Sequence, residues 1–137
     1  MRTTILLLNL LFLLPLTLFA GETPSPEGAK VYFLDLKDGD TVKAPVLIRC
    51  RLTEQMGIAP ALADWPDTGH FHIIIDDKPP NPNKAIHKKH IHLNRGQTEK
   101  TVNLTKGEHT LQLVMGDYSH IPHDPPVMSE RITITVE

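Results

Sequence analysis

The sequence predicts an all-β fold, an immunoglobulin-like antiparallel β-sandwich formed by a single domain. Short segments alternate apolar and polar residues, turn-forming residues separate these segments, and no helical periodicity persists beyond one or two turns. Short strands divided by such turn signals are typical of sandwiches. The length of 137 residues, reduced by an N-terminal targeting segment, suits one domain with one core.

About seven strands are expected, each from residues that favour strands or from alternation with a period of two. In residues 46–52, for example, the apolar side chains share one face and two arginines share the other. The expected strands cover residues 31–36, 46–52, 70–76, 90–93, 98–104, 110–115 and 132–136.

The segments between the expected strands are rich in turn formers. Residues 37–40 read Lys-Asp-Gly-Asp, which is typical of a tight turn. Residues 54–68 have room for at most one short helical turn, because Gly57, Pro60 and Pro66 interrupt them.

The N-terminus has the pattern of a signal peptide. Arg2 precedes an apolar run from Ile5 to Phe19, and Ala20 offers a small residue at a cleavage point. We therefore expect a signal peptide in residues 1–20, a flexible lead in 21–29 and the sandwich in 30–137. The mature protein would be periplasmic or secreted. The sequence contains no second long apolar segment, so no membrane span is expected in the mature chain.

Composition excludes some function classes. The formal net charge is −2, basic residues are scattered and aromatic residues make up 5%, so a nucleic-acid partner is not expected. Cys50 is the only cysteine, so an internal disulfide is excluded. Because Cys50 alternates with Ile48 and Leu52, we expect a core thiol, which argues against a blue-copper site.

The order of motifs resembles a family of short secreted bacterial proteins catalogued as domain of unknown function four-three-nine-nine. The resemblance covers nearly all of the mature chain and implies an exported, single-domain protein without an established activity. Family members often carry three consecutive histidines where this chain has His70-Phe71-His72. The motifs that carry the resemblance lie in residues 37–42, 56–61, 68–76, 96–99, 107–111 and 116–129.

Six of the eight histidines form three close pairs. On a β-strand, residues two apart point to the same face, so His70 and His72 would project together. Phe71, Ile73 and Ile75 would then pack inward, which leaves both histidines on the outward face, available to a ligand. The other two pairs are His90 with His92 and His120 with His123.

Imidazole is the commonest protein ligand for transition metals, so the pairs predict a metal site. Thioether sulfur favours Cu(I), which makes copper the first expectation and zinc the second. Ring N–H groups of metal-bound histidines need acceptors, for which Asp76, Asp117 and Asp124 are candidates. The expected ligands are His70, His72, His92, His120, His123 and Met128.

A second hypothesis remains open. The chain would be an immunoglobulin-like structural or interaction module with an unknown protein partner, and its histidines would be scattered or bonded to the backbone. Enzymatic activity is not expected. His70-Phe71-His72 resembles a tripeptide of copper-zinc superoxide dismutase, but the glycine-rich loops and cysteines around it are missing, so redox catalysis is a remote alternative.

Overall fold

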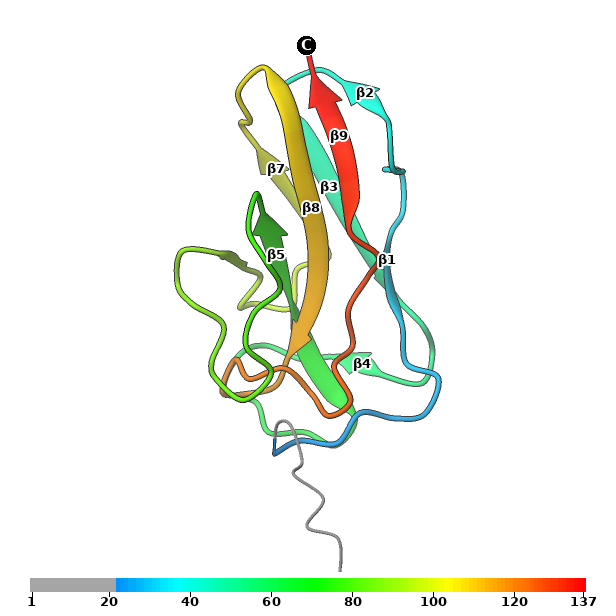
Figure 1. The fold of residues 1–137 in the computed structure, drawn as a ribbon. Coiled ribbons are helices and arrows are strands. Elements are labelled where there is room, and N and C mark those ends of the chain that lie inside the picture. Colours follow the sequence, from blue (N-terminus) through cyan, green and yellow to red (C-terminus); the bar gives the residue numbers. More distant parts are fainter. Residues whose placement is uncertain (1–21) are drawn as a thin grey trace, which may run out of the picture.

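A computed structural model describes residues 22–137; the expected signal peptide, residues 1–20, lies outside the described residues. The described part of the chain contains nine strands and no helix. Figure 1 shows the two sheets packed face to face, which confirms the predicted all-β sandwich.

The smaller sheet has three antiparallel strands. β3 (Val46–Leu52) lies in the middle, between β1 (Val31–Phe33) and β7 (Glu99–Val102). β3 coincides with its prediction, whereas β1 ends at Phe33, before the predicted end at residue 36.

The larger sheet carries His70, His72 and His92. Its longest strands, β8 (Gly107–Gly116) and β5 (Thr68–Ile75), pair antiparallel along six residues of each. The other edge of β5 pairs with two short strands, one at Thr68 and Gly69 and one at His72 and Ile73. The remaining strands of this sheet are β2 (Thr41–Val42), β9 (Ile132–Val136), β4 (Gly57–Ile58) and β6 (Ile91–His92).

Residues 54–68, which left room for at most one short helical turn, form no helix. Residues 57–58 form β4, which runs parallel to the start of β5. The Gly57 N–H donates to the Asp67 carbonyl, and the Ala59 N–H donates to the Gly69 carbonyl. These strand-like bonds satisfy backbone groups that a helical turn would have paired locally.

Alternation of side chains along the strands places the core between the sheets. Phe71 and Ile73 from β5 meet Leu113 and Met115 from β8 and Cys50 from β3, all fully buried. The inward face predicted for β5 is therefore confirmed. Burial raises the pKa of the Cys50 thiol to about 12, which matches the expected core thiol.

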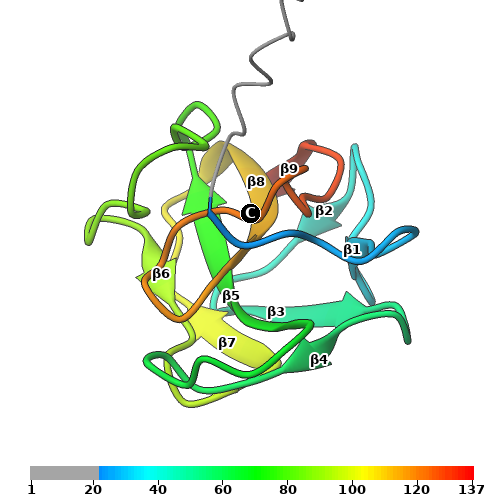
Figure 2. The ribbon, with the colours of Figure 1, turned by 90° about the horizontal axis from the view of Figure 1, so that it is seen from below.

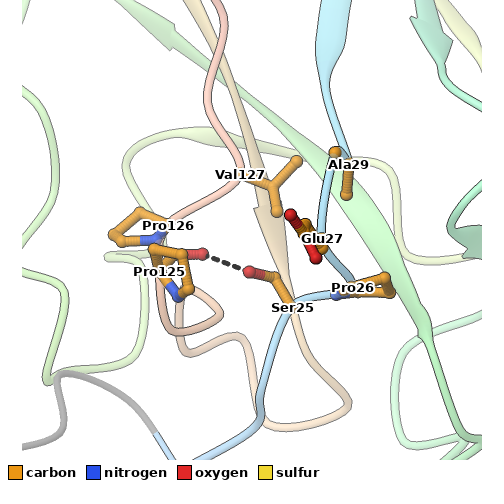
Figure 3. Close-up of a pocket in the computed structure, with 8 residues that line it drawn as sticks. Ser25, Pro26, Glu27, Ala29, Pro125, Pro126 and Val127 are labelled. Atoms are coloured by element: carbon orange, nitrogen blue, oxygen red, sulfur yellow. Dashed lines mark hydrogen bonds between the residues drawn. The ribbon is translucent and has the colours of Figure 1, made fainter.

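The segment expected to be a flexible lead lies against the loop that follows β8. The Asp124 N–H donates to the Thr23 carbonyl, and the Ser25 N–H donates to the Asp124 carbonyl. Figure 3 shows the Ser25 hydroxyl reaching the Pro125 carbonyl, at 2.7 Å, beside a pocket that Pro26 and Val127 also line.

The outward face of β5 is covered as well. Figure 2 shows the chain after β8, in orange, passing close to β5 and β6. Ile86, from the loop before β6, packs with Ile74 and Val114 in a small second cluster. The prediction that His70 and His72 point away from the main core is right, but their expected accessibility is wrong, because both side chains are fully buried.

Candidate metal centre

Three segments that are separate in sequence bring four histidines together. His70 and His72 lie on β5, and His92 on β6 pairs directly with His72. His120 comes from the loop after β8, which is hydrogen-bonded to the loop before β6 through the Ile86 N–H and the His120 carbonyl. Strand register thus aligns three of the imidazoles on one face, and the loop adds the fourth.

A glycine makes room for the cluster. Gly116 ends β8 directly opposite His70. A Cβ atom at position 116 would lie 2.4 Å from Cε1 of His72, closer than any real contact allows. The imidazole of His72 therefore occupies the space over Gly116, and only glycine permits this arrangement.

The ring nitrogens of three histidines converge on Nδ1 of His120. Nε2 of His70 lies 2.9 Å from this atom, and Nε2 of His72 and Nδ1 of His92 each lie 3.3 Å from it. An imidazole nitrogen carries either one lone pair or one proton, so Nδ1 of His120 has a single site with which to bond three neighbours. A cation that accepts lone pairs from all of them would satisfy these four converging nitrogens at once.

The spacing fits metal coordination. The ligand nitrogens of His70, His72 and His120 all lie within 4.8 Å of one another. With metal–nitrogen bonds of 2.0–2.1 Å, neighbouring ligands are about 3.4 Å apart in a tetrahedron and about 2.9 Å apart in a square. The distances of 2.9 and 3.3 Å from His120 Nδ1 to Nε2 of His70 and of His72 are close to these values. Ligands of one ion lie at most about 4.1 Å apart at these bond lengths, so any pair near the 4.8 Å limit would have to draw together on binding.

Burial keeps the cluster neutral. Burial and the neighbouring histidines lower the pKa of His70 to about 4 and that of His72 to about 2. The pKa of His120 is lowered by the same causes, burial first. At neutral pH these rings therefore carry free lone pairs, the form that binds metals.

His92 has its ring orientation set by the backbone. Its Nε2–H donates to the carbonyl of His87 at 3.2 Å. Because this bond places the proton on Nε2, the lone pair of His92 is on Nδ1, the atom that faces His120. Such a bond to the distal nitrogen is the usual support of a metal-binding histidine.

Asp117 organises the loop that carries His120. One of its carboxylate oxygens accepts the N–H groups of Ser119 and Ile121, and the other accepts the Thr23 hydroxyl. The His120 N–H donates to the Asp117 carbonyl, and His120 itself has a left-handed φ of 65°. A non-glycine residue in this region is strained, and such strain is concentrated at ligand-binding positions.

Two buried nitrogens in the cluster lack hydrogen bonds of good geometry. They are the Nδ1 atoms of His70 and His72, which face away from His120. Each unsatisfied group costs about 1–3 kcal/mol. Such a cost in adjacent residues is expected of a functional site rather than of a core optimised for stability.

Two expected ligands lie apart from the convergence point. His123 is fully buried, but its Nε2–H donates to the Thr68 carbonyl at 3.1 Å. Met128 forms a bridge with Val114 on the side of β8 away from β5, and its side chain is 37% exposed. The structure thus brings together His70, His72, His92 and His120.

Three aspartates were expected to accept hydrogen bonds from the ring N–H groups of the ligands, and only Asp117 supports the cluster. It does so by bonding to the loop of His120 and through its negative charge. The Asp117 carboxylate opposes the lowering of the pKa of His70 and His120. Asp76 instead accepts a hydrogen bond from Nδ1–H of His109, and Asp124 is bonded through its backbone to the N-terminal segment. The roles of Gly116 and of the His87 carbonyl were not anticipated, because both depend on pairings between distant segments.

The model of a family described as Domain of unknown function (DUF4399) matches residues 48–137, about two thirds of the chain and all the histidines discussed above. No curated protein and no solved structure matches the chain. In the described part of the chain, no helix has the length and apolar character to cross a membrane.

Proposed function

We propose that this chain, which belongs to the family described as Domain of unknown function (DUF4399), is an exported protein that binds one transition-metal ion. His70, His72 and His120 would form the ligand set, with His92 as a fourth ligand at its edge. The signal-peptide pattern of residues 1–20 supports a periplasmic or secreted location.

One observation carries the proposal: three imidazole nitrogens lie within 3.3 Å of Nδ1 of His120, which has one site to bond them. Hydrogen bonding alone would leave buried polar atoms unsatisfied, and protonation is opposed by burial and by the neighbouring rings. A bound metal ion would bond all four converging nitrogens without protonating any ring.

Copper is the first candidate and zinc the second. The proposed ligands are imidazoles, which suit both metals, and divalent copper binds a given nitrogen site more tightly than zinc does. The proposed ligands include no sulfur, because Met128 lies beyond β8, away from the cluster.

The test is a calorimetric titration of the metal-free protein with Cu²⁺ and with Zn²⁺ in a non-coordinating buffer. We expect one ion to bind per chain, and His120→Ala to weaken binding at least a hundredfold. The matched control is His109→Ala, which removes a histidine bonded to Asp76 and Thr105, away from the cluster.

Equal affinity in His120→Ala and His109→Ala would overturn the proposal. The double variant His70→Ala/His72→Ala extends the test to the buried ligands, and its melting temperature is measured to confirm folding. If no metal binds, the chain is better treated as an immunoglobulin-like interaction module, in which histidines such as His123 form hydrogen bonds to backbone carbonyls.

A further inference from the structure

The loop between β5 and β6 forms an open surface cavity of about 260 Å³, separate from the histidine cluster. It lies next to the metal centre, because His87 at its wall also supplies the carbonyl bonded to His92. The cavity is lined by residues from Asp77 to His90 and by no other part of the described chain.

Three lysines border this cavity, whose surface is otherwise mostly apolar. Lys78, Lys84 and Lys89 all line the cavity, in a chain whose net charge is −2. Asp77 is the one acidic side chain in the lining, and it already pairs with Lys89. Within residues 22–137 no carboxylate pairs with Lys78 or Lys84, so both ammonium groups are available to an anion.

The remaining walls are apolar and stiff. Pro79, Pro80 and Ala85 line the cavity beside the lysines. Proline restricts the backbone in the free protein, so less conformational entropy is lost when a ligand binds. A cavity that combines ammonium groups with short apolar walls suits a small organic anion whose charge is carried by carboxylates.

We propose that this cavity binds a small polycarboxylate. The loop reaches the metal centre at two points, where Ile86 donates to the His120 carbonyl and His87 accepts from His92. If the proposed metal function holds, the polycarboxylate brings the metal as its chelate. The ion would exchange carboxylate oxygens for imidazole nitrogens, and the free carboxylate would leave.

The anion site is tested without any metal, so its failure is distinct from failure of the metal centre. Citrate is titrated calorimetrically into the metal-free protein at low salt. We expect saturable binding that weakens as salt rises, and at least fivefold weaker binding in Lys78→Gln/Lys84→Gln. The control Lys100→Gln/Lys106→Gln removes the same charge from β7 and the turn before β8.

Absence of citrate binding, or an equal loss of citrate affinity in both double variants, would overturn the proposed anion site. Phosphate binding as tight as citrate binding would overturn its selectivity for carboxylates. The chelate role is tested by the rate of copper uptake from copper citrate and from aqueous copper. Lys78→Gln/Lys84→Gln should slow copper uptake from copper citrate but not from aqueous copper. An equal change in both rates would overturn the proposed delivery of copper as a chelate.

Discussion

The imidazole of His72 takes the place that any side chain on Gly116 would fill, with only 2.4 Å between Cε1 and the position of a Cβ atom. This relationship couples the end of β8 to a proposed metal ligand on β5. It also explains why a glycine stands where the strand turns into the loop that carries His120.

Gly116→Ala should therefore displace His72. We expect a loss of stability of about 1–3 kcal/mol from overpacking, and metal affinity lowered at least tenfold. Chemical denaturation and calorimetric titration measure the two effects. Gly107→Ala is the control: its φ of 122° makes substitution costly, but no atom lies near the new methyl group. Metal affinity should be unchanged there, and a similar loss would contradict the role of Gly116.

Removal of the Asp117 carboxylate should release the loop of His120. Asp117→Ala deletes the acceptor of the Ser119, Ile121 and Thr23 bonds, so we expect a destabilisation of about 2–4 kcal/mol. Metal should also dissociate faster, as measured by chelator competition. Asp117→Asn keeps an acceptor oxygen and should retain most of the stability. If Asp117→Asn loses as much stability as Asp117→Ala, the negative charge of Asp117, and not its hydrogen bonds to the loop, is its main contribution to stability.

The metal-free protein should lose stability in acid. Because the pKa of His70 is lowered to about 4 and that of His72 to about 2, the unfolded chain binds more protons than the folded one below pH 6.5. The free energy of unfolding should fall as pH drops from 6.5 towards 4, by about 2–3 kcal/mol for each of the two histidines. Urea denaturation across this range measures it, and a flat profile would contradict the buried, neutral cluster.

His109 should show the opposite behaviour. Its Nδ1 contacts the Asp76 carboxylate at 2.6 Å and its Nε2 contacts the Thr105 carbonyl at 2.9 Å, so both nitrogens donate and the ring is protonated. The bond to Asp76 is the largest cause of the raised pKa of His109. Its stabilisation is complete below pH 6.5 and is lost as pH rises through the raised pKa.

We expect this contribution to be less than about 1 kcal/mol, because Asp76 is half exposed. Proton NMR titration of the His109 ring gives its pKa directly. The substitution Asp76→Asn should return that pKa towards 6.5, and a pKa already below 6.5 in the unmodified protein would exclude the ion pair.

Cys50 should be inert in the folded protein. Its side chain is fully buried and its pKa is about 12, so almost no thiolate is present at neutral pH. Alkylation by iodoacetamide should therefore occur only after unfolding, as followed by mass spectrometry in increasing urea. Rapid alkylation without denaturant would show that the core opens at β3.

The sequence by itself determined the fold class and the inward face of β5. Alternation with a period of two is a local property, and burial of one face follows from it directly, as Phe71 and Ile73 show. The same alternation placed His70 and His72 together on the opposite face, because neighbouring positions of one strand need no tertiary information.

Only the tertiary structure decided which histidines meet. His72 and His92 are paired by strand register, and the loop of His120 is held in place by the Ile86 N–H, which donates to the His120 carbonyl. Both contacts join residues distant in sequence. His123 lies only three residues from His120 yet bonds to the Thr68 carbonyl, because the path of the loop, not proximity in sequence, sets the direction of each ring. Burial of the cluster depends in the same way on segments packed over β5, which no local pattern in β5 encodes.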